Sequence, residues 1–300
     1  MMAPPSSVPD SVQTRAGESN LDATRLQEIL EIARHTPGPR VVLTGAGISA
    51  ESGIPTFRGA EGYWQVGSRN YQPSELATLR AFTEMPAEIW AWYLYRRAVC
   101  RAALPNDGHR ALAELEATLG DRFLLITQNV DGLHLRAGNS QDRTYQIHGN
   151  LDFTRCSAGC HIGVDPLPDE LSAWRKDQAL DAASRELLHC PHCGAWLRPH
   201  VLWFDECYDE VRYRFESSLS AAESCGILLI VGTSGATNLP MQVAARVAER
   251  GVPLIVVDPE PSPFTEMAEA SPAGCFAQGL AGEWVPQICA ELANKPVNPS

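Results

Sequence analysis

The sequence predicts an α/β protein with a doubly wound parallel sheet and a smaller lobe inserted into it. Three observations predict this class: four short runs that are almost wholly apolar, helical patterns between them, and two stretches that break the alternation. Continuous apolar runs are typical of parallel strands, because helices cover both faces of such a sheet. Strands that alternate with helices then indicate a Rossmann-like topology.

Strands and helices are expected to alternate along most of the chain. The apolar runs occupy residues 40–44, 123–127, 227–231 and 253–257. Helical patterns occupy residues 21–34, 108–119 and 239–250. Leu26, Ile29 and Leu30 share one face of the first helix. Pro37 and Gly38 follow that helix and are expected to end it.

Two stretches do not follow the alternation, and each is expected to be an insertion into the sheet domain. Residues 63–105 are helix-rich and carry several clustered aromatic residues, and residues 151–205 hold two close pairs of cysteines. Together they would form the smaller lobe. The expected parts are a flexible tail, a Rossmann-like domain in three pieces, a helical insertion and a cysteine-bearing insertion, at residues 1–20; 21–62, 106–150 and 206–300; 63–105; and 151–205.

The overall charge excludes one class of partner. The 300-residue chain has a formal net charge of −12, and an acidic surface repels phosphate backbones, so nucleic-acid binding is not expected. No apolar stretch approaches the roughly 18 residues that suggest a membrane span. Residues 1–20 lack the apolar centre of a signal peptide. We therefore expect a cytoplasmic protein, monomeric and without a membrane partner.

A glycine-containing loop follows the first expected strand. Small residues at this place let the backbone approach a pyrophosphate and leave amide groups free to bind it. A Gly-x-Gly pair alone also occurs in ordinary tight turns, but here small and polar residues continue to Gly59. The loop residues expected at a nucleotide are Gly45, Ala46, Gly47, Ser49 and Ala50.

Polar residues follow two further strands at the point where each ends. In open α/β sheets, ligands bind outside the carboxyl ends of the strands, so these residues are placed to contact a bound sugar. They are Gln128, Asn129 and Asp131 after the second strand, and Gly232, Thr233 and Ser234 after the third.

His148 ends a short extended run, between the nucleotide loops and the cysteine-bearing stretch. A lone histidine is usually structural or exposed. At a junction between two lobes, however, an imidazole that titrates near neutral pH can take a proton from a hydroxyl group. His148 is therefore a candidate general base.

Four of the nine cysteines form two close pairs, Cys156 with Cys160 and Cys190 with Cys193. Two such pairs about thirty residues apart match a tetrahedral zinc ribbon. Four thiolates leave no open position for substrate or water, so we expect a structural zinc ion. Alternative ligands are His161, His189 and His192.

Taken together, these motifs resemble the sirtuins. The resemblance rests on Gly45–Gly59, residues 127–134, His148-Gly149, the four cysteines, residues 198–204 and Gly232-Thr233-Ser234, which come in the family's order. It covers residues 40–234. It implies a protein that uses NAD, bound between two lobes, to remove acyl groups from protein lysines.

The resemblance also implies a reaction sequence. The amide oxygen of an acyl-lysine attacks the ribose carbon that bears nicotinamide, and nicotinamide leaves. His148 then takes a proton from a ribose hydroxyl, which attacks the acyl carbon, and water releases lysine and O-acyl-ADP-ribose. Asn129 and Asp131 match residues that orient the ribose and the water. NAD+ and one structural Zn2+ are the implied cofactors, and acyl-lysine proteins are the implied substrates.

Further site residues are carried over from the same resemblance. Phe57 and Arg58 match a mobile cofactor loop, and Asp258 and Phe276 complete the expected NAD contacts. The segment that flanks the acyl-lysine and pairs with the peptide as an added strand is matched by Val201, Trp203 and Phe204.

Tyr93 and Arg96 bear on which acyl group is removed. They are three residues apart on an expected helix and share a face, so a phenol and a guanidinium can grip a carboxylate. This Tyr-x-x-Arg resembles the sirtuin branch that removes succinyl, malonyl and glutaryl groups, and Ala60 matches a small residue that widens the acyl pocket there. The alternative is that both side chains face the surface and the substrate is acetyl-lysine.

Two departures from the family pattern bear on the substrate. The loop between Ser234 and Pro240 is one residue longer than usual, and it borders the peptide. Asp205 stands where a glycine is common, and its carboxylate would disfavour an acidic acyl group or favour basic peptides. Two rival functions stay open: a protein mono-ADP-ribosyltransferase that uses the same cofactor, and a non-catalytic NAD-sensing regulator.

Overall fold

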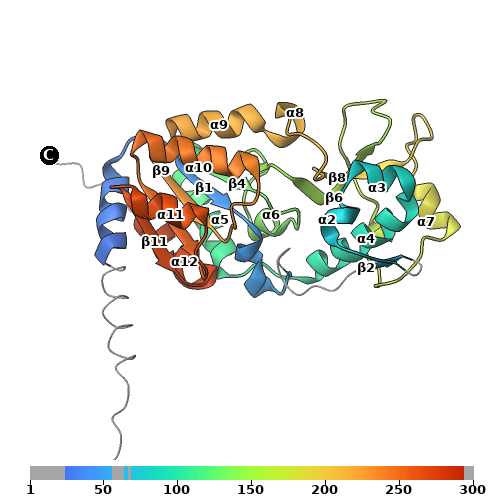
Figure 1. Ribbon diagram of the computed structural model, residues 1–300, viewed down its shortest axis with the longest axis horizontal. Coiled ribbons are helices and arrows are strands. Elements are labelled where there is room, and N and C mark those ends of the chain that lie inside the picture. The colour runs from blue at the N-terminus through green and yellow to red at the C-terminus, as the bar shows by residue number, and fades with distance from the viewer. Residues whose placement is uncertain (1–23, 56–63, 67–68, 294–300) are drawn as a thin grey trace, which may run out of the picture.

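The computed structural model describes residues 24–55, 64–66 and 69–293. It forms a larger lobe around a central sheet and a smaller lobe beside it (Figure 1). The tail expected at residues 1–20 and three predicted site residues, Phe57, Arg58 and Ala60, lie outside the described residues. No described helix is both long enough and apolar enough to cross a membrane.

The larger lobe contains a sheet of six parallel strands in the order β11-β10-β9-β1-β4-β5. β1 lies inside the sheet, and its last residue, Thr44, pairs with Thr127 of β4 and Val231 of β9. The carboxyl ends of these three strands are therefore level. In chain order the strands are β1 Arg40–Thr44, β4 Phe123–Thr127, β5 Thr144–Gln146, β9 Ile227–Val231, β10 Leu254–Asp258 and β11 Gly274–Gln278.

Helices cover both faces of this sheet, and alternate side chains of each strand enter different cores. Val42 packs with one group of helices, whereas Val41 and Leu43 pack with the other. The first group is the helix over residues 24–35, α5 Asp107–Leu119 and α12 Ala281–Ala293. The second is α9 Phe215–Ser224, α10 Asn238–Arg250 and α11 Pro263–Ala270. The predicted doubly wound sheet is confirmed.

Two of the six strands lie outside the four predicted apolar runs: β5 overlaps the short extended run expected before His148, whereas β11 was not predicted. β5 has three residues, too few for a recognisable apolar run, and β11 has the sequence Gly-Cys-Phe-Ala-Gln, which lacks the β-branched residues typical of strands. The fourth predicted strand begins at Leu254, one residue later than expected. The first helix ends at residue 35.

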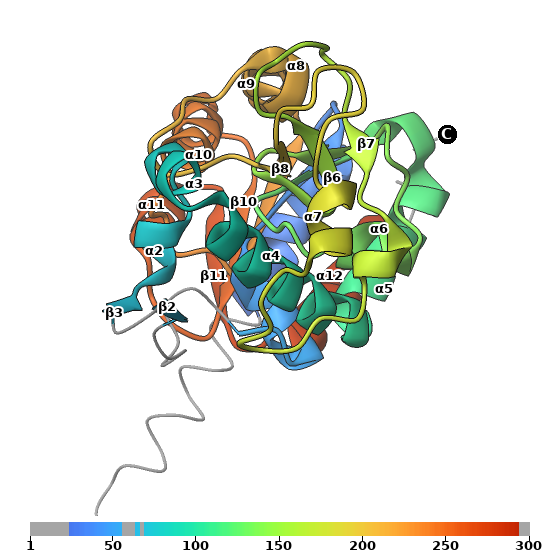
Figure 2. The same ribbon diagram turned by 90° about the vertical axis from the view of Figure 1, so that its right-hand side faces the viewer.

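The smaller lobe combines both predicted insertions around one hydrophobic core, which holds Trp90 from the first and Trp203 from the second. Figure 2 looks onto this lobe and shows α4 beside α7 and the strands β6, β7 and β8. Its elements are β2 Trp64–Val66, β3 Arg69–Tyr71, α2 Pro73–Leu76, α3 Leu79–Glu84, α4 Pro86–Ala102, β6 Gly149–Cys156, β7 Asp165–Pro166, α7 Ala182–Leu187 and β8 Leu197–Val201.

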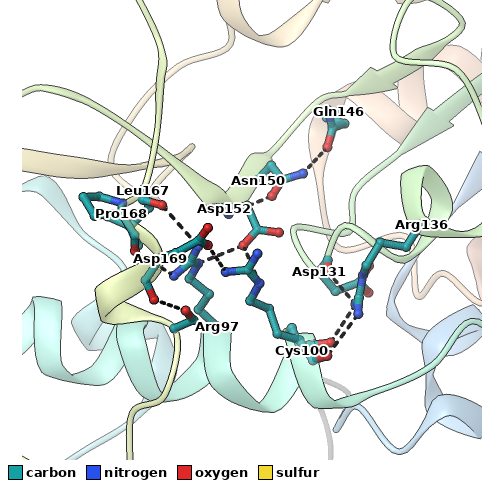
Figure 3. Close-up of polar contacts among 12 residues, drawn as sticks. Arg97, Cys100, Asp131, Arg136, Gln146, Asn150, Asp152, Leu167, Pro168 and Asp169 are labelled. Carbon is teal, nitrogen blue, oxygen red and sulfur yellow. Dashed lines mark hydrogen bonds and ion pairs between the residues drawn. The ribbon is translucent and has the colours of Figure 1, made fainter.

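An ion pair between buried Arg97 and partly exposed Asp152 joins the two insertions (Figure 3). Arg97 of α4 donates to Asp152 of β6 at 2.8 Å, and its remaining N–H groups reach the carbonyls of Leu167 and Pro168. From the larger lobe, Arg136 donates to the carbonyl of Cys100 at 2.6 Å. The C-terminal half of α4 is therefore tied to both neighbouring parts of the chain.

We expect the substitution Arg97→Met to lower the free energy of unfolding by about 2 kcal/mol, because Asp152 and the carbonyls of Leu167 and Pro168 lose a buried charged donor. Arg97 is 2% exposed. Arg101→Met is the matched control, since Arg101 also approaches Asp152, at 3.6 Å, but is 38% exposed. Its loss is expected to cost less than about 1 kcal/mol. Urea unfolding measures both, and equal losses would refute this account.

Candidate active site

The glycines after β1 and β9 bring two loops together backbone to backbone. Gly45 donates its N–H to Val231 at 2.9 Å, and Gly47 donates to Gly232 at 2.8 Å. A Cβ atom on Gly47 would lie 2.5 Å from the Cα of Gly232, which has a positive φ of 59°. The glycines therefore let the two loops touch at the carboxyl edge of the sheet, and we name this contact the glycine cradle. The N–H groups of Gly45 and Gly47 are used in it, so these two amides are not free to bind a pyrophosphate as expected. Ala46 and Ala50 flank the cradle in the 3-10 turn Ala46–Ser52.

Beside this cradle, Ser49, Asn129 and Asp131 converge. The Ser49 hydroxyl donates to the Asp131 carboxylate at 2.7 Å and accepts from the Asn129 amide at 3.0 Å. Burial raises the pKa of Asp131, opposed by hydrogen bonds from the Leu133 N–H and Ser49. The sequence placed these three residues on two separate loops, and the structure brings them together.

Gln128 links the loop after β4 to the loop after β9. Its amide donates to the Thr233 hydroxyl at 2.8 Å, and its side-chain carbonyl accepts from the Thr237 hydroxyl at 2.9 Å. Thr237 belongs to the loop that is one residue longer than the family pattern. Sequence reasoning did not identify Thr237 as a site residue. Ser234, half-buried, lies in the same loop.

His148 lies between β5 and β6, where the chain passes from one lobe to the other. Its Nδ1 is 3.0 Å from the main-chain carbonyl of Gln128, and its Nε2 is 2.7 Å from the Tyr208 hydroxyl. Burial lowers the pKa of His148 to about 4, and the Gln128 carbonyl opposes this shift. The imidazole is therefore neutral at pH 7, as a general base must be. Tyr208 was not among the predicted residues.

Tyr93 is buried, at 4% exposure, so the alternative of a surface-facing tyrosine is wrong. Its hydroxyl accepts the indole N–H of Trp203 at 2.8 Å. Burial raises the pKa of Tyr93, so the phenol keeps its own proton. The positive charge of Arg96 acts in the opposite direction on the pKa of this phenol. The Arg96 guanidinium itself lies over the Trp92 ring, 5.3 Å from its centre.

Arg198 packs against the segment of Val201, Trp203 and Phe204, which is expected to flank the acyl-lysine. Its guanidinium lies 3.5 Å from the centre of the Trp203 ring, and it binds Glu206 through two hydrogen bonds of 2.6 and 2.7 Å. Trp203 and Val201 are consequently buried, whereas Phe204 is 64% exposed. Of the three predicted substrate-flanking residues, Phe204 alone presents most of its side chain to solvent.

Asp205 has a structural task. Its two carboxylate oxygens accept the N–H groups of Leu79 and Arg80 at 2.7 and 3.2 Å, at the start of α3. A carboxylate in this position is favoured by the free amides and dipole of the helix. The expectation that Asp205 would repel an acidic acyl group is therefore weakened.

The remaining expected NAD contacts lie further along the sheet. Asp258 is the last residue of β10 and accepts the N–H of Glu260 at 3.1 Å. Phe276 lies in the middle of β11 and packs against the core. Asp258 is at the same edge as the glycine cradle, whereas Phe276 is two residues short of it.

The four predicted cysteines gather in the smaller lobe, at the end of β6 and in the turn after α7. All four sulfur atoms lie within 4.8 Å of one another. The alternative histidines are not part of this set: the Nδ1 of His189 instead donates to the Arg185 carbonyl at 2.7 Å, and its ring packs on Trp196. Four converging sulfurs fit a tetrahedral metal ion with a closed coordination sphere.

The model of the Sir2 family matches residues 45–238, a range that includes the cradle, His148, the four cysteines and the loop after β9. The chain belongs to the Sir2 family. The resemblance stated from the motifs is thereby confirmed, and it extends to the fold.

Relatives within the Sir2 family match most of the chain. An NAD-dependent protein deacylase of Leptospira interrogans is 39% identical over 254 residues, which are 85% of this chain and 93% of the relative. The mitochondrial NAD-dependent protein deacylase sirtuin-5 of Danio rerio is 38% identical over 258 residues, 82% of this chain and 80% of the relative. A solved complex of a Sir2 homolog with NAD has a TM-score of 0.71 at 32% identity, covering 89% of this chain and 93% of that one.

Proposed function

We propose that this Sir2 protein is an NAD-dependent protein-lysine deacylase. One observation carries the proposal: a neutral, half-buried His148 lies in the same hydrogen-bonded network as the polar loops that follow three parallel strands. Such an edge is where open α/β sheets bind nucleotides. Nicotinamide release that depends on added acyl-lysine peptide tests it.

The residues present fit NAD. Gly45, Gly47 and Gly232 put no side chain at the carboxyl edge of the sheet, so a pyrophosphate there can approach the backbone closely. Asn129 and Asp131 lie beside these glycines, with polar side chains suited to ribose hydroxyls. When bound, NAD supplies the electrophilic ribose carbon and the hydroxyl that receives the acyl group.

In this function His148 accepts a proton from the ribose hydroxyl at Nε2. Its Nδ1–H is held by the Gln128 carbonyl, which fixes the ring and the tautomer. The four-cysteine cluster holds Zn2+ as a structural ion, because all four coordination positions are taken by sulfur. The acyl-lysine peptide lies against Phe204 and pairs with its segment as an added strand.

We further propose that acidic acyl groups, succinyl or malonyl, are preferred over acetyl. Burial keeps the Tyr93 phenol protonated, and its oxygen already accepts from Trp203, so the phenol acts toward a ligand carboxylate as a donor. Arg96 offers a planar fork to the same carboxylate. The Asp205 carboxylate was expected to disfavour an acidic acyl group, but it is bound by the amides at the start of α3.

The substitution Arg96→Met is expected to lower kcat/KM for a succinyl-lysine peptide about 10- to 100-fold, the value of a hydrogen bond to a charged group. The same change should leave an acetyl-lysine peptide within about threefold. Arg101→Met, on the same helix but more exposed, is the control for loss of positive charge. An equal loss with both peptides would show that Arg96 is structural.

The rival mono-ADP-ribosyltransferase would give a different product, with ADP-ribose attached to protein and the acyl group untouched. A non-catalytic regulator would bind NAD without releasing nicotinamide. Both outcomes are distinguishable in the same assay.

A further inference from the structure

Tyr208 covers the nitrogen that the deacylase reaction needs. The Nδ1 of His148 faces a main-chain carbonyl, which can only accept, so Nδ1 carries the proton. In a neutral imidazole Nε2 is then unprotonated, and the Tyr208 hydroxyl donates to it at 2.7 Å. The lone pair that must receive the ribose proton is already in use.

An imidazole nitrogen of this type has one lone pair in the plane of the ring and accepts one good hydrogen bond. The Tyr208 hydroxyl and a ribose hydroxyl therefore compete for it. Burial raises the pKa of Tyr208 to about 12, with the Thr237 side chain acting against this shift. The phenol consequently remains a donor across the physiological pH range.

The segment that carries Tyr208 is fixed by hydrogen bonds at both ends, and between them side chains hold it. Glu206 is bound by Arg198 on one side, and Asp209 caps α8 Glu210–Tyr213 on the other. No backbone hydrogen bond joins Cys207 or Tyr208 to the rest of the chain that the structure describes. Tyr208 packs against Phe215, with ring centroids 6.2 Å apart. Its ring also packs against the core and lies 5.8 Å from the His148 ring. Moving the phenol from Nε2 therefore costs side-chain packing but no backbone hydrogen bond of Tyr208 within the described residues.

We propose that Tyr208 is a positioning residue that caps His148: its hydroxyl occupies Nε2 in the free enzyme and must yield that nitrogen to a ribose hydroxyl before proton transfer. This inference rests on the proposed deacylase function. It assigns a task to Tyr208, whose hydroxyl bonds His148 and interacts with the Thr237 side chain of the lengthened loop.

Tyr208→Phe removes the hydroxyl and keeps the ring. Without the competitor, ADP-ribose, added alone and measured by titration calorimetry, is expected to bind roughly two- to tenfold more tightly, which is what one neutral hydrogen bond is worth. Tyr213→Phe is the matched control. The Tyr213 hydroxyl accepts from Arg155 at 3.3 Å and makes no hydrogen bond to His148 within the described residues, so the affinity of this variant for ADP-ribose should not change.

A second readout separates the two halves of the reaction. Exchange of labelled nicotinamide into NAD, with an acetyl-lysine peptide present, needs no general base, whereas O-acetyl-ADP-ribose formation does. The ratio of product formation to exchange is expected to rise two- to tenfold in Tyr208→Phe, following the freed hydrogen bond. Partial unfolding lowers both rates together and leaves the ratio unchanged.

If Tyr208→Phe leaves both the ADP-ribose affinity and the ratio of product formation to exchange unchanged, the proposal that Tyr208 caps His148 is wrong. A fall in this ratio would also contradict it, because Tyr208 would then take part in proton transfer. If wild-type protein forms no product at all, the deacylase function fails, and calorimetry still decides whether Tyr208 competes with ADP-ribose.

Discussion

Replacing His148 with alanine is expected to lower O-acyl-ADP-ribose formation by about 10²- to 10⁴-fold, the usual contribution of a general base. Nicotinamide exchange should persist, because the first step needs no base. The physical reason lies in the geometry: Nδ1 is fixed by the Gln128 carbonyl, and Nε2 is the ring atom left to accept a proton. Single-turnover mass spectrometry of product, beside an exchange assay, measures both.

A control is needed because removing any buried ring costs stability. His200 is suitable, since burial also lowers its pKa to about 4 and it stacks on Tyr213 instead of facing the loops. His200→Ala should keep its ratio of product to exchange. If both histidine variants lose product formation equally, or if exchange disappears with it in His148→Ala, the assignment of His148 as the base is wrong.

Loss of the metal site should have the largest effect on stability. Cys190→Ser is expected to abolish zinc binding and to leave the smaller lobe unfolded. Binding of structural zinc contributes about 10–16 kcal/mol of apparent free energy in small domains. This is as large as the whole free energy of unfolding of a typical protein, about 5–15 kcal/mol. The cysteines also carry part of the core: Cys156 and Cys190 pack in the same hydrophobic cluster as Trp90 and Trp203.

Metal analysis and thermal unfolding test this expectation. Wild-type protein should hold one zinc ion per chain, and chelation should lower its melting temperature. His192→Ala is the matched control, because His192 lies next to the cluster in sequence but is not part of the sulfur set. Zinc retained in Cys190→Ser, or lost in His192→Ala, would contradict a four-cysteine site.

The central strands were predictable from sequence because each is a local apolar run. β1, β4 and β9 lie where the pattern placed them, and the loops that follow them hold the expected glycines and polar residues. The four cysteines were equally clear, since two short spacings suffice to define them. β5 and β11 carry no such local signal.

Contacts between distant parts of the chain could not be predicted. Tyr208 lies 60 residues from His148, and Thr237 lies 109 residues from Gln128. Arg97 and Asp152 pair across the two insertions. No periodicity reports such pairings, because each depends on how the lobes pack. The lengthened loop and Asp205 could be recognised in the sequence as departures from the family pattern. Their partners, Gln128 and the amides of α3, could not be predicted.

The most direct test of the central claim is to incubate the purified protein with NAD and an acyl-lysine peptide, acetyl or succinyl, and to identify every product by mass spectrometry. The account predicts equal amounts of nicotinamide, deacylated peptide and O-acyl-ADP-ribose. ADP-ribose attached to protein with the acyl group retained, or NAD bound without any nicotinamide released, would contradict it.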